Sequence, residues 1–183
     1  IQPADTTPQV EYRYRNGRKV MFSARRIRVK RLLDDVKDYI RSENRRLDWQ
    51  RINLNNIGWR IVNANQSRYV GRQVANWQLD LEPDERHWDR HVTVRFPEAL
   101  KAAGAYFVTA RMQDGNIARI IIWVADTVIV KKPLKQQMLY YVADAVSGQA
   151  LPGVDLEFFG YRTRSIKDTH RYRIVHRELN KKT

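Results

Sequence analysis

Cysteine is entirely absent from this chain of 183 residues. Without a thiol, the chain cannot form disulfides, thiolate nucleophiles or cysteine-held zinc and iron–sulfur sites. Glycine is scarce, with 8 residues, and no two of them form a Gly-x-Gly pattern that would indicate a phosphate-binding loop. None of the serines lies in a Gly-x-Ser-x-Gly elbow. These absences argue against redox, acyl-transfer and nucleotide chemistry.

Long hydrophobic runs are also lacking. The longest, 120–130, is interrupted by Asp126 and Thr127 and is far shorter than the roughly 20 residues that a bilayer crossing requires. The sequence begins at Ile1, with no basic stretch followed by an apolar one. We therefore expect no membrane span in these residues, and any targeting segment to have been removed or to lie outside this sequence.

Positive charge is the strongest bias of the composition, with a formal net charge of +14. The excess is confined to residues 11–31 and 161–183, while the rest of the chain is balanced. Clustered Lys and Arg side chains can bind a polyanion, with an affinity that falls steeply as salt rises. Alternatively, both segments are strands with one solvent-exposed face, as the alternation of Tyr12 and Tyr14 with charged residues indicates.

Alternation of apolar and polar residues with period two recurs along most of the chain and predicts β-strands. It is clearest where Trp77, Leu79 and Leu81 alternate with polar neighbours. An Asp-Gly pair in 113–116 favours a tight hairpin, so the strands on either side of it should pair antiparallel. The predicted strands are Val10–Tyr14, Lys19–Ile27, Val74–Leu81, His91–Phe96, Ala105–Met112, Ile117–Val124, Met138–Ala145, Val154–Phe159 and Arg171–Leu179.

One segment has helical periodicity instead. Apolar residues recur at helical spacing from Val29 to Ile40, which predicts an amphipathic helix over Val29–Arg41, lying over a sheet edge or open end. The mixed stretch Leu47–Arg72 reads as a long connection with a short strand or turn that docks Trp49 and Trp59 on the sandwich.

Many short strands, frequent turns and one inserted helix predict an antiparallel, immunoglobulin-like β-sandwich over residues 8–131. The polar, proline-containing segment 132–137 is interpreted as a linker. Residues 138–183 contain too few strands to close a sandwich, so they are predicted to be the first strands of a second, incomplete one.

Candidate catalytic side chains are few. His87 and His91 stand four residues apart, but the pair leads directly into a predicted strand, which favours surface histidines over metal ligands. His170 and His176 lie in the basic tail and are expected to be solvated. Asp80 and Glu82 would lie on one strand face, about 7 Å apart, a spacing found in almost every β-protein.

Two further features fit a structural interpretation better than a functional one. Asn65-Gln66-Ser67 is a formal glycosylation acceptor, relevant only in a eukaryotic secretory route. Most aromatic residues alternate with charged ones and are expected in the core, although aromatic platforms can also bind sugars or single strands. We therefore predict a non-enzymatic chain with no catalytic residue, no cofactor site and no metal site.

Three runs resemble the N-terminal macroglobulin domains of bacterial alpha-2-macroglobulin-like proteins. They are Gly104-Ala-Tyr-Phe-Val-Thr-Ala-Arg-Met-Gln-Asp-Gly-Asn, then 120–132 with its Val-Ala-Asp, then 139–158 with Asp144, Gly148 and Pro152-Gly153. A weaker likeness covers Tyr12–Ile27. The turn residues agree with the resemblance, because Ser147-Gly148 and Pro152-Gly153 can turn one strand into the next.

The resemblance implies a periplasmic or extracellular protein of serial sandwiches that traps proteases through a bait region and, in many members, a thioester. This chain has no cysteine for a thioester. It is therefore expected to be a structural module whose partners are other domains of the same protein and a captured protease. No specific nucleic acid is expected, and membrane contact is expected only through regions outside this chain. The alternatives are a basic polyanion-binding β-domain for nucleic acid or an anionic surface, and a carbohydrate-binding module.

Overall fold

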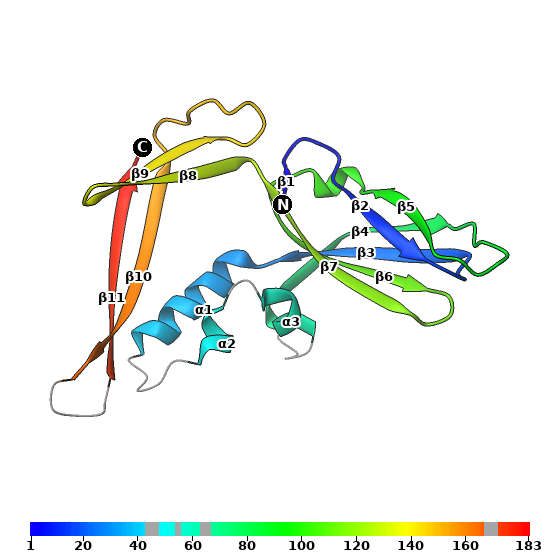
Figure 1. Cartoon of the computed structure of the whole chain (residues 1–183), viewed down its shortest axis with the longest axis horizontal. Helices are drawn as coiled ribbons and strands as arrows, with labels where there is room; N and C mark the ends of the chain where they lie inside the picture. Colours follow the sequence, from blue (N-terminus) through cyan, green and yellow to red (C-terminus); the bar gives the residue numbers. More distant parts are fainter. Residues whose placement is uncertain (43–47, 54–55, 63–66, 167–171) are drawn as a thin grey trace.

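The computed structural model describes the whole chain except residues 43–47, 54–55, 63–66 and 167–171. The described part is made mostly of β-strands, with one long helix and several short helical segments (Figure 1). In chain order the described elements are β1 Gln2–Pro3, β2 Gln9–Tyr14, β3 Lys19–Ile27, α1 Val29–Arg41, α2 Trp49–Ile52, α3 Ile57–Val62, η2 Ser67–Tyr69, β4 Val70–Asp80, β5 Arg90–Arg95, η3 Glu98–Leu100, β6 Gly104–Met112, β7 Ile117–Ala125, β8 Thr127–Leu134, β9 Gln137–Asp144, β10 Asp155–Ser165 and β11 Tyr172–Lys182. None of the described helices is long and apolar enough to cross a membrane.

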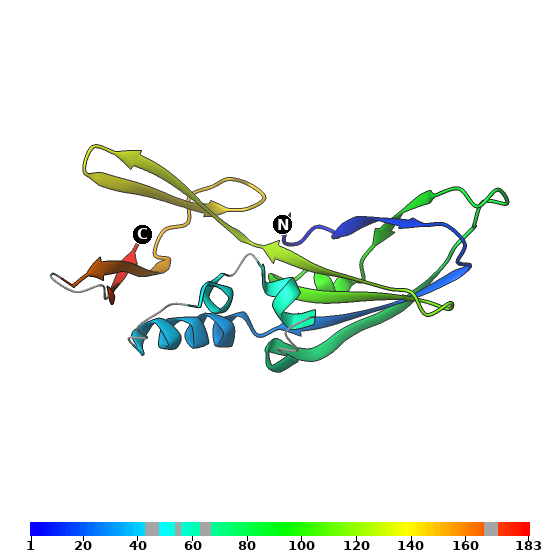
Figure 2. The same ribbon diagram turned by 60° about the horizontal axis from the view of Figure 1, so that its bottom comes forward.

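Two stacked sheets form the first part of the molecule. The larger sheet has the strand order β1-β7-β6-β3-β4, and the smaller one consists of β2 and β5. Figure 2 shows the smaller sheet, in blue and green, above the larger one. Apart from the short parallel pairing of β1 with β7, the strand pairs of this part are antiparallel. The predicted antiparallel sandwich is confirmed.

Aromatic side chains join the two layers. The ring of Tyr12 on β2 meets Phe22 on β3 edge to face, with the ring centroids 5.6 Å apart. Phe96, which follows β5, meets Trp77 on β4 in the same way at 5.5 Å. Such edge-to-face pairs stabilise beyond the area they bury. The smaller sheet therefore covers β3 and β4, on one side of the larger sheet.

The turn between β6 and β7 is the hairpin that the Asp-Gly pair predicts. Gly115 has a φ of 94°, a left-handed conformation that a glycine adopts without steric cost. The carboxylate of Asp114 accepts hydrogen bonds from the backbone and side-chain nitrogens of Asn116, both at 3.0 Å. The strands then pair antiparallel from Arg111 opposite Ile117.

Helix α1 has the predicted bounds and contacts two parts of the molecule. Leu32, in its first half, is buried among Ile27 and Ala105 at the end of the larger sheet, together with other apolar residues. Ile40, in its last turn, is buried with Ile52 and with Ile174 of β11. The helix therefore connects the open end of the sandwich to the C-terminal strands.

The interpretation of 47–72 as a connection that docks two tryptophans is wrong where the structure describes it. The chain forms the short helices α2 and α3 there, and Trp49 and Trp59 are 64% and 51% exposed. The buried apolar side chains among the described ones of these helices are Ile52 and Ile61, and Arg60 is buried beside Ile61 in α3. Leu47, at the start of this stretch, lies outside the described residues.

Segment 132–137, predicted as a linker, is the tip of a β-hairpin. Strand β8 runs through Pro133, which is paired with Met138, and β9 begins at Gln137. Proline fits here because β8 is an edge strand, where a missing N–H need not break a ladder. The division into domains at 8–131 and 138–183 stays a prediction.

The last two strands, β10 and β11, form a second, longer hairpin that lies against α1 (Figure 1). The ammonium of Lys37 is 2.6 Å from the Glu157 carboxylate of β10, and Arg41 Nε donates to Glu178 of β11 at 2.8 Å. These ion pairs surround the buried contact of Ile40, so the helix orients the hairpin.

We expect Ile40→Ala to loosen the β10–β11 hairpin without unfolding the sandwich. Removing a buried isoleucine costs about 3 kcal/mol, and here the loss falls on the contact between α1 and β11. Hydrogen exchange should speed up in β10 and β11 and stay unchanged in β3 and β6. The control is Leu33→Ala, which alters an exposed leucine of the same helix. Equal exchange in both variants would contradict the coupling.

Candidate functional site

The two histidines singled out in the sequence have different partners. Nδ1 of His87 lies 3.0 Å from the side-chain oxygen of Asn16 in a turn, and His87 itself has a φ of 60°. His91 lies on β5, with its Nδ1 4.0 Å from the carboxylate of Glu11. Within the described part of the chain, no three His, Asp or Glu side chains are close enough to hold a metal ion.

The two carboxylates singled out in the sequence are exposed at the end of β4. Asp80 is 79% exposed and lies 3.7 Å from the ammonium of Lys19. The backbone carbonyl of Glu82 accepts a hydrogen bond from the hydroxyl of Tyr14 at 3.1 Å. Neither residue lines one of the three cavities described below. Of the glycosylation triplet, Ser67 is exposed at the start of η2, and Asn65 and Gln66 lie outside the described residues.

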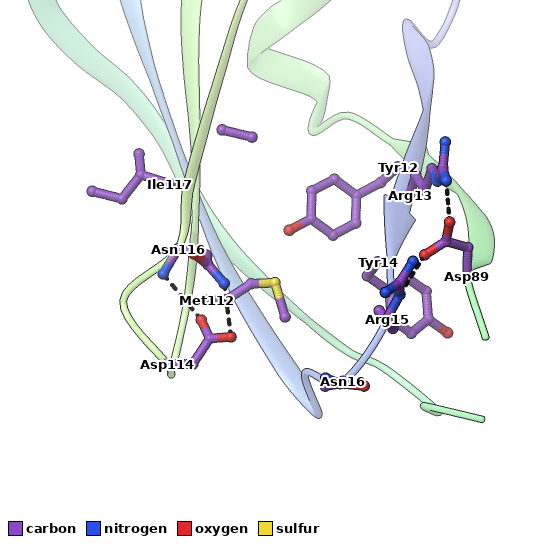
Figure 3. A pocket seen from close by; sticks show the side chains of 11 residues that line it. Tyr12, Arg13, Tyr14, Arg15, Asn16, Asp89, Met112, Asp114, Asn116 and Ile117 are labelled. Atoms are coloured by element: carbon purple, nitrogen blue, oxygen red, sulfur yellow. Dashed lines mark hydrogen bonds and ion pairs between the residues drawn. The ribbon is translucent and has the colours of Figure 1, made fainter. Parts of the chain in front are cut away.

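A pocket of about 530 Å³ opens between β2 and the β6–β7 hairpin, at the free end of the sandwich (Figure 3). We call it the mouth pocket. Figure 3 shows Tyr12 pointing from β2 toward the β6–β7 hairpin, while Arg13 and Arg15 turn away toward Asp89. Its apolar lining consists of Tyr12, Tyr14, Met112, Ile117 and Ala118.

Asp89 holds the polar rim of the mouth pocket together. Its carboxylate is hydrogen-bonded to the guanidinium of Arg13 and accepts a second hydrogen bond from Nε of Arg15 at 2.9 Å. The two arginine hydrogen bonds, from Arg15 and then Arg13, lower the pKa of Asp89 to about 2. Sequence reasoning missed this group. The period of β2, which places Arg13 and Arg15 on one face, was a usable signal that a carboxylate faces them.

Tyr12 is the polar group nearest the floor of the mouth pocket. Burial, and secondarily the charge of Asp114, raises the pKa of its hydroxyl, so the side chain is neutral at physiological pH. The carboxylate of Asp114 accepts hydrogen bonds from Asn116. Both carboxylates of this pocket therefore have hydrogen-bond partners within the chain.

Several other cations of the basic segment 11–31 also have partners within the fold. Arg25, Arg26 and Arg28 donate to the backbone carbonyls of Gly71, Ala103 and Arg68, respectively. Their role in the structure is to satisfy carbonyl oxygens at strand and helix ends.

A cluster of aromatic and charged side chains joins α1 to η2. The hydroxyl of Tyr69 donates to Asp35 at 2.9 Å, and Arg68 lies 3.3 Å from the same carboxylate. Burial, and then this bond to Asp35, raises the pKa of Tyr69. The guanidinium of Arg60, 3% exposed, lies over the Tyr69 ring at 5.8 Å. The adjoining cavity measures about 30 Å³, too small for an organic substrate.

A second large concavity, of about 590 Å³, lies between the β8–β9 and β10–β11 hairpins, and we call it the hairpin groove. The two hairpins touch where the rings of Tyr140 and Phe158 approach to 4.8 Å. The apolar lining consists of Met138, Tyr140, Leu156, Phe158 and Leu179. Arg177, Lys181 and Lys182 add positive charge to it.

The outer face of the β8–β9 hairpin is apolar and exposed as well. Val130 and Leu139 are 53% and 51% exposed, and Tyr141, paired with Val130, is 46% exposed. Contiguous exposed apolar residues mark interaction surfaces. Because both faces of this hairpin are apolar, it suits a position between two other layers of structure.

The turn that joins the two hairpins is well defined. The Asp144 carboxylate accepts hydrogen bonds from the backbone N–H groups of Val146 and Ser147 and from the Ser147 hydroxyl, which lowers its pKa. Gly148 and Gly153 adopt φ values of 71° and 73°. These are the turn positions that the sequence indicates, and they set the path from β9 to β10.

The mouth pocket and the hairpin groove share two features. Both combine an apolar floor with strands that have one edge without a partner among the described strands. Such surfaces suit extended polypeptides, which pair with the edge and insert alternate side chains.

Comparison with solved structures identifies the fold. One match is a crystal structure of native alpha-2-macroglobulin from Escherichia coli spanning domains MG0-NIE-MG1. The alignment covers 98% of this chain and 53% of that one, with a TM-score of 0.54 and 13% sequence identity. A second, spanning domains NIE-MG1, matches 100% of this chain and 82% of its own, with a TM-score of 0.55 and 12% identity. The chain thus spans about half the length of the first. No family model matches the chain, and no curated protein matches it significantly. The likeness shows a macroglobulin-like β-sandwich fold.

We expect Asp89→Asn to destabilise the protein at neutral pH but not in strong acid. The folded-state pKa of about 2 lies below the value of about 3.9 for an unfolded aspartate. The stabilisation is therefore complete above the unfolded value and is lost as the pH falls through the folded one. Urea midpoints of the two proteins, measured across this range, should converge in acid.

The matched control is Asp80→Asn, which removes an exposed carboxylate with a single, longer ion pair. It should shift the urea midpoint much less than Asp89→Asn. Equal shifts for both variants at neutral pH would contradict the structural role of Asp89.

Proposed function

We propose that this chain is a non-catalytic structural module of a larger alpha-2-macroglobulin-like protein. The observation that carries the proposal is the apolar hairpin groove together with the exposed outer face of β8–β9. These surfaces need a covering layer, and other domains of the same protein would supply it. The fold likeness to fragments that contain successive alpha-2-macroglobulin domains supports this reading.

The proposed task is to space and orient neighbouring domains. A sandwich with an aromatic core is rigid, and α1 transmits its orientation to β10 and β11 through Leu32 and Ile40. A domain seated on the hairpins would then be held at a defined angle to the sandwich. In the whole protein, such modules would help to form a wall around a captured protease, with the trapping chemistry in other parts.

The proposed location is the periplasm or the extracellular space. This rests on the resemblance to the bacterial family and is consistent with the absence of cysteine, which makes the fold independent of the redox state. The partners proposed are the adjoining domains and, through the assembled protein, a protease.

The isolated chain should reveal its uncovered hairpins. A two-stranded sheet is marginal in water, and its unpaired edges invite pairing with another copy. We expect residues 1–183 either to dimerise through 138–179 or to show much weaker hydrogen-exchange protection there than in 8–131. Sedimentation and exchange measurements would decide. Leu139→Lys should suppress any dimer, because it places a charge on the outer face of β9.

A monomer with equal protection in both segments would refute the incomplete second sandwich. It would mean that the hairpins are stable without a covering layer, and the proposed structural role would lose its main support.

The absence of catalysis is tested in the full-length protein. Replacing His87, His91, Asp80 and Glu82 together by alanine should leave protease capture, followed by a gel-mobility shift, unchanged. Their side chains are exposed and their contacts, including the hydrogen bond of His87 with Asn16, lie at the surface, so folding should also be retained. Loss of function in a variant with an unaltered circular dichroism spectrum would favour an enzyme instead.

A further inference from the structure

The two layers of the sandwich are unequal, and the smaller one ends above the middle of the larger. Strand β2 lies over β3, as the Tyr12–Phe22 contact shows, while β5 lies over β4. No described strand of the smaller sheet lies beyond β2. On the far half of the larger sheet, Ala118 and Ile120 share the face of buried Ile122 but are exposed, Ile120 by 46%.

Strand β2 has an edge that is open to a further strand. The N–H of Phe96 donates to the carbonyl of Pro8, so the backbone groups of Pro8 and of every second residue after it point toward β5. Those of Gln9, Glu11 and Arg13 consequently point away from β5. No described strand pairs with this edge.

At its first position, this edge is already satisfied by a group that imitates a strand. The side-chain amide of Gln2 donates to the Gln9 carbonyl at 2.6 Å and accepts from the Gln9 N–H at 2.9 Å. A primary amide thereby makes the two bonds that a backbone residue of a neighbouring strand would make. The same pair of groups is available at Glu11 and Arg13.

We propose that the mouth pocket binds an extended peptide segment, which adds a third strand to the smaller sheet at the open edge of β2. Its backbone pairs with Glu11 and Arg13, and its alternate side chains cover Ala118 and Ile120. The observation that carries this proposal is the juxtaposition of an unpaired edge with an uncovered apolar sheet face. It concerns the first sandwich and is independent of the structural role proposed for the hairpins.

The occupant is a single strand rather than a second copy of this chain. Pairing β2 with β2 of another copy would require a two-fold axis perpendicular to the smaller sheet. The larger sheet projects beyond β2, so the larger sheets of both copies would then occupy the same space. A lone extended segment, such as a tail or a long loop of a partner protein, fits between β2 and the β6–β7 hairpin without this conflict.

The occupant's inward side chains are uncharged and apolar. The rim carboxylates already have partners within the chain, since Asp89 binds Arg13 and Arg15 and Asp114 accepts hydrogen bonds from Asn116. A charged side chain entering the pocket would lose its hydration and would have to displace one of these bonds to gain a partner. The length of β2 sets the segment at about six residues, or roughly 20 Å of extended chain.

The probe is a fluorescently labelled peptide of alternating threonine and valine, compared with a peptide of the same composition in which the three valines are consecutive. Anisotropy at physiological salt reports binding to residues 1–183. Hydrogen exchange of the Glu11 and Arg13 amides reports the site. We expect the alternating peptide to bind more tightly and to protect both amides.

Two variants distinguish strand pairing at the edge of β2 from nonspecific hydrophobic binding. Glu11→Pro removes the open-edge N–H and leaves the pairing of β2 with β5 intact, while Glu11→Ala removes the same side chain and keeps that N–H. We expect Glu11→Pro to weaken binding about 5-fold or more relative to Glu11→Ala, as the loss of one hydrogen bond implies. Ala118→Glu, at an exposed position, should abolish binding by charging the pocket floor.

Equal affinity of Glu11→Pro and Glu11→Ala would overturn the proposal, provided that both retain the wild-type circular dichroism spectrum. If Glu11→Pro fails to fold, Ala118→Glu serves as the test instead. Unchanged peptide binding by Ala118→Glu would also overturn the proposal. The proposal also fails if saturating peptide protects only β8–β11, or protects no amide of β2.

Discussion

The buried face of α1 is the contact on which the arrangement of the molecule depends. Leu32 and Ile40 are eight residues apart, so they lie on one side of the helix, about 12 Å from each other along its axis. Leu32 belongs to the apolar cluster at the end of the larger sheet, and Ile40 to the cluster that includes Ile174 of β11. Through this one helix, the orientation of the sandwich determines where the β10–β11 hairpin lies, and that hairpin forms one wall of the hairpin groove.

The rest of the molecule is organised by what its small sheets leave uncovered. A five-stranded sheet faces a two-stranded one, and two further hairpins have no sheet on their outer sides among the described residues. Unpaired edges and apolar faces are costly in an isolated protein and useful in an assembly. Part of the positive charge, by contrast, forms ion pairs within the fold, as Arg13 and Arg15 do with Asp89. These uncovered surfaces are the features on which the proposed binding of polypeptide rests.

Sequence reasoning located the elements better than it located the sites. The bounds of β3 and α1 follow directly from the alternation of Val20, Phe22 and Ala24 and from the helical spacing that follows. The mouth pocket was not foreseen, because its floor comes from β6 and β7 and its edge from β2, nearly a hundred residues earlier. The role of Asp89 was not foreseen either, since its arginine partners lie more than 70 residues away.

The sequence by itself determined most of the strands, though not β1 or β8, together with the position of the long helix α1 and of the tight turns, because these depend on side chains within a few residues of one another. Only the tertiary structure decided that β8 continues through Pro133 to pair with β9, that Trp49 and Trp59 remain exposed, and that α1 meets β11. The reason is physical. An apolar strand face or helix stripe specifies that it must be covered, but many faces of the same chain are equally apolar, and the choice among them is made by the packing of all the elements at once.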